Sequence, residues 1–135
     1  MQPHMREISP WTSLRRLGNQ VLLYPRGDRF NLSSLNEHDD VLFFFEARFN
    51  ERKIVLNARI NGKWYEPYGD KLPLGKGYQS HLRIWNNPQN IQVYIQGQRE
   101  PFIIFTHAPG VRPAKDYIKW RVEGDVEVSF FGFER

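Results

Sequence analysis

Three alternating positions in one short stretch of this sequence are suited to forming a binding surface. In the run VLFFFEARFN, Phe44, Glu46 and Arg48 occupy every second place. Side chains alternate between the two faces of a β-strand, so these three are predicted to share one face. Phe43 and Phe45 point to the other face, which is predicted to be the core. The outward face therefore carries an aromatic ring beside a carboxylate and a guanidinium.

Two further side chains are predicted to join that face. Asn57 stands among the outward positions of the next run, KIVLNARI, and Trp64 follows after Asn61-Gly62. A tryptophan offers a flat surface for the CH face of a sugar ring, while amide, carboxylate and guanidinium groups offer forked hydrogen bonds to hydroxyls. This mixture indicates carbohydrate binding. The alternative is a solvated outer face whose charges pair with each other, and the pattern alone leaves both open.

Short strands separated by turn residues position these side chains. Asn61-Gly62 between two runs predicts a tight hairpin, because both residues tolerate positive φ. No window of 11 residues or more has a helical period. The pattern predicts an all-β sandwich or barrel. The expected strands are Gln20–Tyr24, Asp28–Ser34, Asp40–Asn50, Lys53–Ile60, Lys63–Glu66, Tyr78–Trp85, Asn90–Gln96, Pro101–Thr106, Tyr117–Val122 and Asp125–Phe133.

Length and composition predict one globular domain. The chain has 135 residues, of which 40% are hydrophobic, no cysteine, and a net charge of +4. We expect residues 1–18 to be an N-terminal extension and residues 19–135 to be the domain. The N-terminus lacks the apolar segment of a signal peptide, and no apolar run is long enough to span a membrane. A cytoplasmic or leaderless-secreted protein is expected.

The sequence shows no pattern typical of an enzyme. The acidic run Glu37-His38-Asp39-Asp40 resembles a metal cluster on paper but is expected to be a solvated loop. No serine, histidine and aspartate arrangement suggests a nucleophile, and nothing indicates a catalytic residue, a cofactor or a metal site. Nucleic acid is not the expected partner, because the lysines and arginines near Trp64 fall on different faces and loops.

Several stretches resemble the galectin family in order, over roughly residues 17–134. The resemblance is carried by GNQVLLYPRGDRFNLSSL, DDVLFFFEARFNERKIVLNARINGKW, LPLGKGYQSHLRI, NIQVYIQGQREPFIIFTH and DYIKWRVEGDVEVSFFGF. It implies two antiparallel sheets in a jelly-roll-like sandwich of the galectin and concanavalin type, with a shallow groove on one sheet.

The sugar-binding signature of that family is only partly present. Galectins that bind β-galactosides carry His-x-Asn-x-Arg on one strand, Asn on the next, and then Trp followed by Glu-x-Arg. Here Phe44 replaces the histidine and Glu46 the first asparagine, while Arg48, Asn57 and Trp64 match. Phenylalanine cannot hydrogen-bond the axial hydroxyl of galactose, and an ionised glutamate cannot donate as asparagine does. We also expect Glu46 to form an ion pair with Arg48.

The Glu-x-Arg part depends on the alignment. Counting without a gap puts Pro67 and Gly69 at these positions, which loses both groups. The loop before LPL is one residue shorter than in the family, which favours a gap. The gapped count, which we prefer, puts Glu66 and Tyr68 there and keeps only the acid.

The resemblance implies a carbohydrate-binding domain whose β-galactoside specificity is weakened, altered or lost. Its candidate site residues are Phe44, Glu46, Arg48, Asn57, Trp64, Glu66 and Tyr68. The expected partner is a glycan, either an anionic one or one other than lactose. The alternative is a protein-interaction or dimerisation module without sugar binding, using the exposed Phe44. A homodimer through edge strands would fit either function.

Overall fold

The computed structural model describes residues 4–8 and 19–133, and every regular element in them is a β-strand. None of the described residues forms a helix that is long and apolar enough to cross a bilayer. The strands are β1 (His4–Ile8), β2 (Asn19–Leu35), β3 (Val41–Arg48), β4 (Lys53–Ile60), β5 (Lys63–Trp64), β6 (Tyr68–Lys71), β7 (Ser80–Asn86), β8 (Asn90–Ile95), β9 (Ile103–Thr106) and β10 (Lys119–Phe133).

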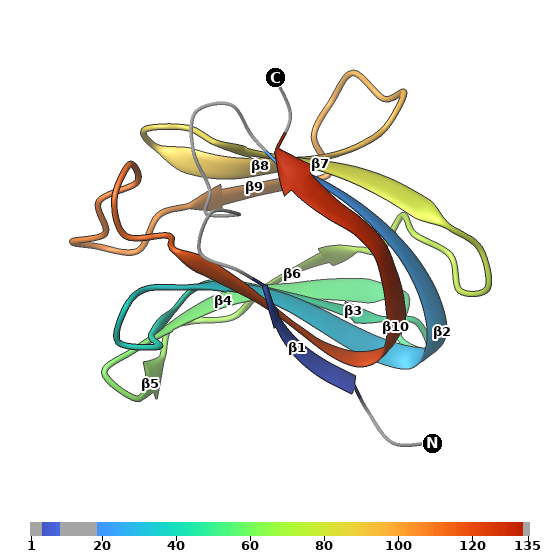
Figure 1. The fold of residues 1–135 in the computed structure, drawn as a ribbon, viewed down its shortest axis with the longest axis horizontal. Coiled ribbons are helices and arrows are strands. Elements are labelled where there is room, and N and C mark those ends of the chain that lie inside the picture. The colour runs from blue at the N-terminus through green and yellow to red at the C-terminus, as the bar shows by residue number, and fades with distance from the viewer. Residues whose placement is uncertain (1–3, 9–18, 134–135) are drawn as a thin grey trace.

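All ten strands belong to one antiparallel sheet that curls into two layers (Figure 1). One layer holds β7, β8 and β9, and the other holds β1, β3, β4, β5 and β6. The long strands β2 and β10 pair with each other and run through both layers. The N-terminal part of β2 pairs with β7, and its C-terminal part pairs with β3. This arrangement confirms the predicted all-β fold of two facing layers.

The bend of β10 depends on a glycine that no larger residue replaces without strain. The pairing of β10 with β2 shifts register between Gly124 and Val126, so that Asp125 bulges. Gly124 has a φ of 115°, and a Cβ on it would lie 2.6 Å from the carbonyl oxygen of Arg29. The sequence predicted strand breaks near Pro25 and Gly124. Those breaks are wrong, because both strands bend together there and stay paired.

The core lies between the layers and confirms the predicted alternation of β3. Phe43, Phe45 and Ala47 are buried, whereas Phe44 between them is half-buried on the outer face. The largest fully buried side chains come from β2, β3, β10 and the loop before β10, namely Trp120, Tyr117, Phe30, Phe43 and Phe45. Packing one face of each layer inward leaves the opposite face of β3 and β4 available for a site.

The observed strands differ from the predicted ones near the N-terminus and around β5 and β6. β1 lies within the predicted N-terminal extension and pairs with β10, while the proposed boundary at residue 19 stays a prediction. β6 was not predicted, and the expected strand Lys63–Glu66 ends at Trp64. The Asn61-Gly62 hairpin is confirmed, with φ values of 54° and 79°. That turn brings Trp64 opposite Arg59 of β4.

Candidate functional site

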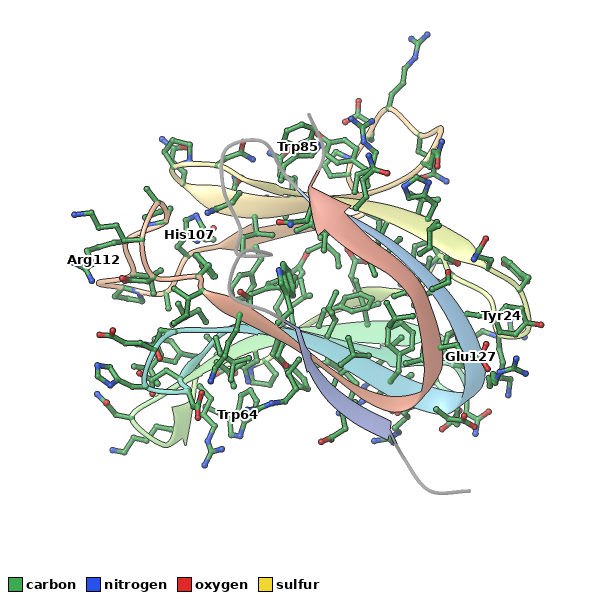
Figure 2. All side chains as sticks on the ribbon, viewed as in Figure 1. Tyr24, Trp64, Trp85, His107, Arg112 and Glu127 are labelled. Carbon is green, nitrogen blue, oxygen red and sulfur yellow. The ribbon has the colours of Figure 1, made fainter. Side chains whose placement is uncertain are left out.

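The predicted site lies on the outer surface of the layer that contains β3 and β4, and we call this surface the site face. Phe44 of β3 stands directly opposite Asn57 of β4, and Glu46 stands opposite Val55. Directly opposed residues of an antiparallel pair point to the same side. The structure therefore brings Phe44, Glu46 and Asn57 together as the alternation predicted. Figure 2 shows Trp64 on the same layer, on the side away from β7, β8 and β9.

One end of the site face is aromatic, and we call Phe44, Asn57, Arg59 and Trp64 the aromatic half. The rings of Phe44 and Trp64 meet edge to face, with centroids 5.1 Å apart and planes at 69°. This geometry is the favoured one for two aromatic rings. The Arg59 guanidinium lies 5.9 Å from the centre of the indole ring. Trp64 is nevertheless 49% exposed, so much of its surface remains open to a ligand.

Asn57 is present on this half but is largely covered. It is only 7% exposed, and its Oδ1 accepts a hydrogen bond of 2.8 Å from the backbone N–H of Ala58. Within the described part of the chain, its Nδ2 has no protein acceptor. Asn57 thus keeps the two N–H donors of its Nδ2 for a ligand, while its Oδ1 already accepts a bond.

The other end of the site face is charged, and we call Arg29, Glu46, Arg48, Glu51 and Lys53 the ionic half. Glu46 Oε1 accepts a 2.7 Å bond from Arg48 Nε, which confirms the predicted ion pair. This bond raises the pKa of the Arg48 guanidinium. Glu51 lies 3.7 Å from Arg48, 3.3 Å from Arg29 and 3.4 Å from Lys53. Each charged group of this half therefore already has a partner within the protein.

Glu51 is a site-face residue that the sequence analysis missed. It lies in the turn between β3 and β4, where side chains follow no strand period. Its closeness to Arg29 depends on β2 lying beside β3, with Arg29 opposite Arg48. The only available signal was the three-residue spacing from Arg48, which is weak outside a helix.

The two remaining candidates lie apart from this cluster. Glu66 is exposed in the segment between β5 and β6, and no contact joins it to the other candidates in the described structure. Tyr68 stands opposite the buried Leu56, so the register puts it on the core side of β4 at the edge of the sheet. Gly69, opposite Val55, is the β6 residue aligned with the site face. This register favours the ungapped count over the gapped one.

The arrangement suits stacking more than hydrogen bonding. Trp64 presents an open aromatic surface, but the adjoining position holds the apolar ring of Phe44. The guanidinium of Arg48, which carries the nearest hydrogen-bond donors, is paired with Glu46 and Glu51. No group of three or more histidine or acidic side chains in the described residues is placed to hold a metal. In the loop 37–40, Asp39 instead pairs with Lys119, and His38 with Glu37 at 3.3 Å.

Comparison with protein families gives one match that covers most of the chain. Residues 19–133 match the family described as galactoside-binding lectin. Two relatives carry the name 32 kDa beta-galactoside-binding lectin. The one from Haemonchus contortus is 29% identical over 105 residues, which cover 77% of this chain and 35% of the relative. The one from Caenorhabditis elegans is 30% identical over 118 residues, covering 84% and 40%. This chain thus spans well under half the length of either relative.

Solved structures show the same fold at lower sequence identity. The galectin LEC-6 of Caenorhabditis elegans superposes with a TM-score of 0.79 at 20% identity, covering 98% of this chain and 90% of its own. Chicken galectin 2 gives a TM-score of 0.81 at 19% identity, covering 95% and 97%. At this level of identity, the solved structures show that the backbone fold is shared. They do not show that the side chains of the site face are shared.

Proposed function

This chain belongs to the galactoside-binding lectin family and holds a galectin carbohydrate-binding domain, and we propose that its β-galactoside specificity is weakened or altered. The site face keeps the stacking surface of Trp64 and the free Nδ2 amide group of Asn57. It does not offer the set of free hydrogen-bonding groups that a galactose-reading site needs. Sugar binding is therefore expected to rest on stacking and to discriminate poorly for the axial hydroxyl of galactose.

The observation that carries this proposal is the edge-to-face contact of Phe44 with Trp64. The centroid distance of 5.1 Å puts an apolar ring directly beside the stacking surface. The family resemblance puts a histidine at this position. A sugar hydroxyl facing Phe44 would lose its hydrogen bonds to water and gain none from the protein. Sites that pair a hydroxyl discriminate strongly, so the loss of that partner removes discrimination as well as affinity.

The Glu46–Arg48 pair supports the same proposal. The 2.7 Å contact occupies the guanidinium Nε and one carboxylate oxygen. Both side chains are largely covered, at 15% and 27% exposure, so exchanging this contact for a sugar hydroxyl means breaking a charge-assisted bond. The two relatives named as β-galactoside-binding lectins indicate the sugar class from which this site departs.

Calorimetric titration with lactose, followed by a glycan array, tests the proposal. We expect no saturable lactose binding up to about 10 mM, a binding free energy weaker than about −3 kcal/mol. On the array we expect binding to other saccharides, which Trp64→Ala abolishes. Trp85→Ala is the matched control, because Trp85 lies on the outer side of the opposite layer. Tight lactose binding that Trp64→Ala abolishes would show that the β-galactoside specificity is intact.

Exposed aromatic residues at the β5–β6 edge favour a second candidate function, a protein-interaction or dimerisation module. Trp64, Tyr65 and Tyr68 are 49%, 42% and 55% exposed. Aromatic residues are enriched in the buried centres of protein interfaces. This function predicts no hit on the glycan array. It also predicts a mass by light scattering that rises with concentration and falls for Tyr68→Ala. A monomer at all concentrations with clear glycan hits would contradict it.

A further inference from the structure

A second concave site lies at the far end of β4 from Trp64. It is a pocket of about 390 Å³ between the β3–β4 turn and the segment that follows β6. Its lining includes the apolar side chains of Phe49, Leu72 and Leu74, and the cationic side chains of Arg52, Lys71 and Lys76. The volume falls in the range of small-molecule sites and suffices for one sugar ring. The pocket thus combines an apolar wall with several charges of one sign.

The three cations of this pocket differ from their neighbours, because no carboxylate of the described residues pairs with them. Within residues 4–8 and 19–133, no carboxylate lies within ion-pair distance of Arg52, Lys71 or Lys76. In the adjacent ionic half, by contrast, Lys53 and two arginines share Glu51. A cleft lined by charges of one sign concentrates its field and attracts an ion of the opposite sign. The pocket is therefore suited to an anionic ligand.

Backbone hydrogen bonds and core packing hold the pocket in shape. The N–H of Leu72 donates to the carbonyl of Arg52 at 3.1 Å, and Lys71 pairs with Lys53 across β4 and β6. Leu72 and Leu74 are each only 9% exposed and belong to the main core. Beyond Lys76, the N–H of Gly77 donates to Pro25 at 2.8 Å. Because these segments are fixed, a ligand would have to order only the ends of three side chains.

We propose that this pocket binds a sulfate or phosphate monoester carried on a sugar ring. The ester would be bound by Arg52, Lys71 and Lys76, since guanidinium and ammonium groups bind such oxyanions strongly. The CH face of the ring would contact the apolar wall. The pocket lies six residues along β4 from the Arg59–Trp64 pair, about 20 Å at the rise of a strand. This site is separate from the proposed lectin site and does not depend on it.

Amide chemical-shift titrations of the full chain with glucose 6-sulfate, glucose 6-phosphate and glucose test this proposal. The two esters are expected to shift the amides of residues 49–52 and 71–76, while glucose shifts them little. Comparing the two esters decides whether sulfate or phosphate is the preferred group. Lys71→Gln with Lys76→Gln is expected to weaken binding of the better ester about tenfold, or about threefold for each exposed cation removed. Raising the salt concentration is also expected to weaken binding of the ester to the unchanged protein.

Two control variants separate this site from general charge effects and from the site face. Arg99→Gln with Lys115→Gln removes the same charge from exposed loops elsewhere and should leave the affinity within about twofold. Trp64→Ala should leave it unchanged, which separates failure here from failure of the proposed lectin function. The proposal is overturned if the shifts map elsewhere, if both double variants act alike, or if glucose binds as well as its esters. Tighter binding of oligothymidylate through the same lysines would overturn it in favour of nucleic acid.

Discussion

Apart from the Nδ2 amide group of Asn57, the two halves of the site face lack free hydrogen-bonding groups for opposite physical reasons. In the aromatic half, the position beside Trp64 holds Phe44, which has no donor or acceptor. In the ionic half, donors and acceptors are plentiful, but Glu46 and Glu51 satisfy the cations around them. The first half could regain its capacity only by substitution. The second could regain it by exchanging a partner, because its groups are still present.

Residues that match the family signature by type do not by themselves make a matching site. Arg48 agrees with the family signature by type, yet its Nε is bonded to a glutamate that stands where the signature has an asparagine. Asparagine carries no charge and would hold the guanidinium less strongly. A retained residue can therefore be inactive because its neighbour has changed. The largest effect is expected from changing both halves at once.

Phe44→His combined with Glu46→Asn should give the largest gain in sugar binding. The imidazole supplies a hydrogen bond in the aromatic half, and the loss of the Glu46 carboxylate frees Arg48 in the ionic half. Each hydrogen bond contributes about 0.5–1.5 kcal/mol net, so lactose affinity should rise about tenfold to a hundredfold. Calorimetry with lactose and with an unrelated disaccharide measures affinity and selectivity together.

The control for the histidine variant frees Arg48 in the same way but introduces no imidazole. Phe44→Leu with Glu46→Asn leaves the aromatic half without a hydrogen-bonding group. We expect it to gain much less lactose affinity than the histidine variant. An equal gain in both variants would show that only the ionic half limits binding, and the contrast between the halves would be lost.

Much of this site face could be predicted from local rules. Alternation along a strand assigned Phe43 to the core and Phe44, Glu46 and Arg48 to the outer face. The positive φ that Asn61 and Gly62 tolerate predicted the turn that brings Trp64 beside β4. These features depend on the backbone period and on single-residue preferences, which can be read from one sequence.

The parts that could not be predicted depend on which strands lie side by side. Glu51 reaches Arg29 because β2 and β3 are neighbours, a relation between residues 22 positions apart in the chain. Tyr68 was assigned to the site, but β6 is short and exposed, and its register with β4 is fixed by hydrogen bonds rather than by a hydrophobic pattern. Likewise, the position of Arg52 and Lys76 in one pocket, without an ion-pair partner among the described residues, is seen only once the loops are placed.

A double-mutant cycle between Phe44 and Trp64 should give the next largest effect. The variants are Phe44→Leu, Trp64→Leu and both together, with the free energy of unfolding measured in urea. We expect a coupling energy of about 1 kcal/mol, because edge-to-face rings attract each other beyond the area they bury. The value should be the same in 1 M NaCl, since no net charge is involved. A coupling of zero would mean that the rings are merely neighbours.

The corresponding cycle in the ionic half should give the smallest effect and the strongest dependence on salt. For Glu46→Gln, Arg48→Gln and the double variant, we expect a coupling of about 0.5–1 kcal/mol at low salt. Glu51 lies 3.7 Å from Arg48 and can replace part of the lost partner, which keeps the value small. In 1 M NaCl, where the Debye length is about 3 Å, the coupling should fall to half or less.

Arg26 and Glu127, which are more exposed, form the control pair and should couple less still. A Glu46–Arg48 coupling that salt does not change would assign the pair to packing rather than charge, because only the Coulomb part of the interaction is screened.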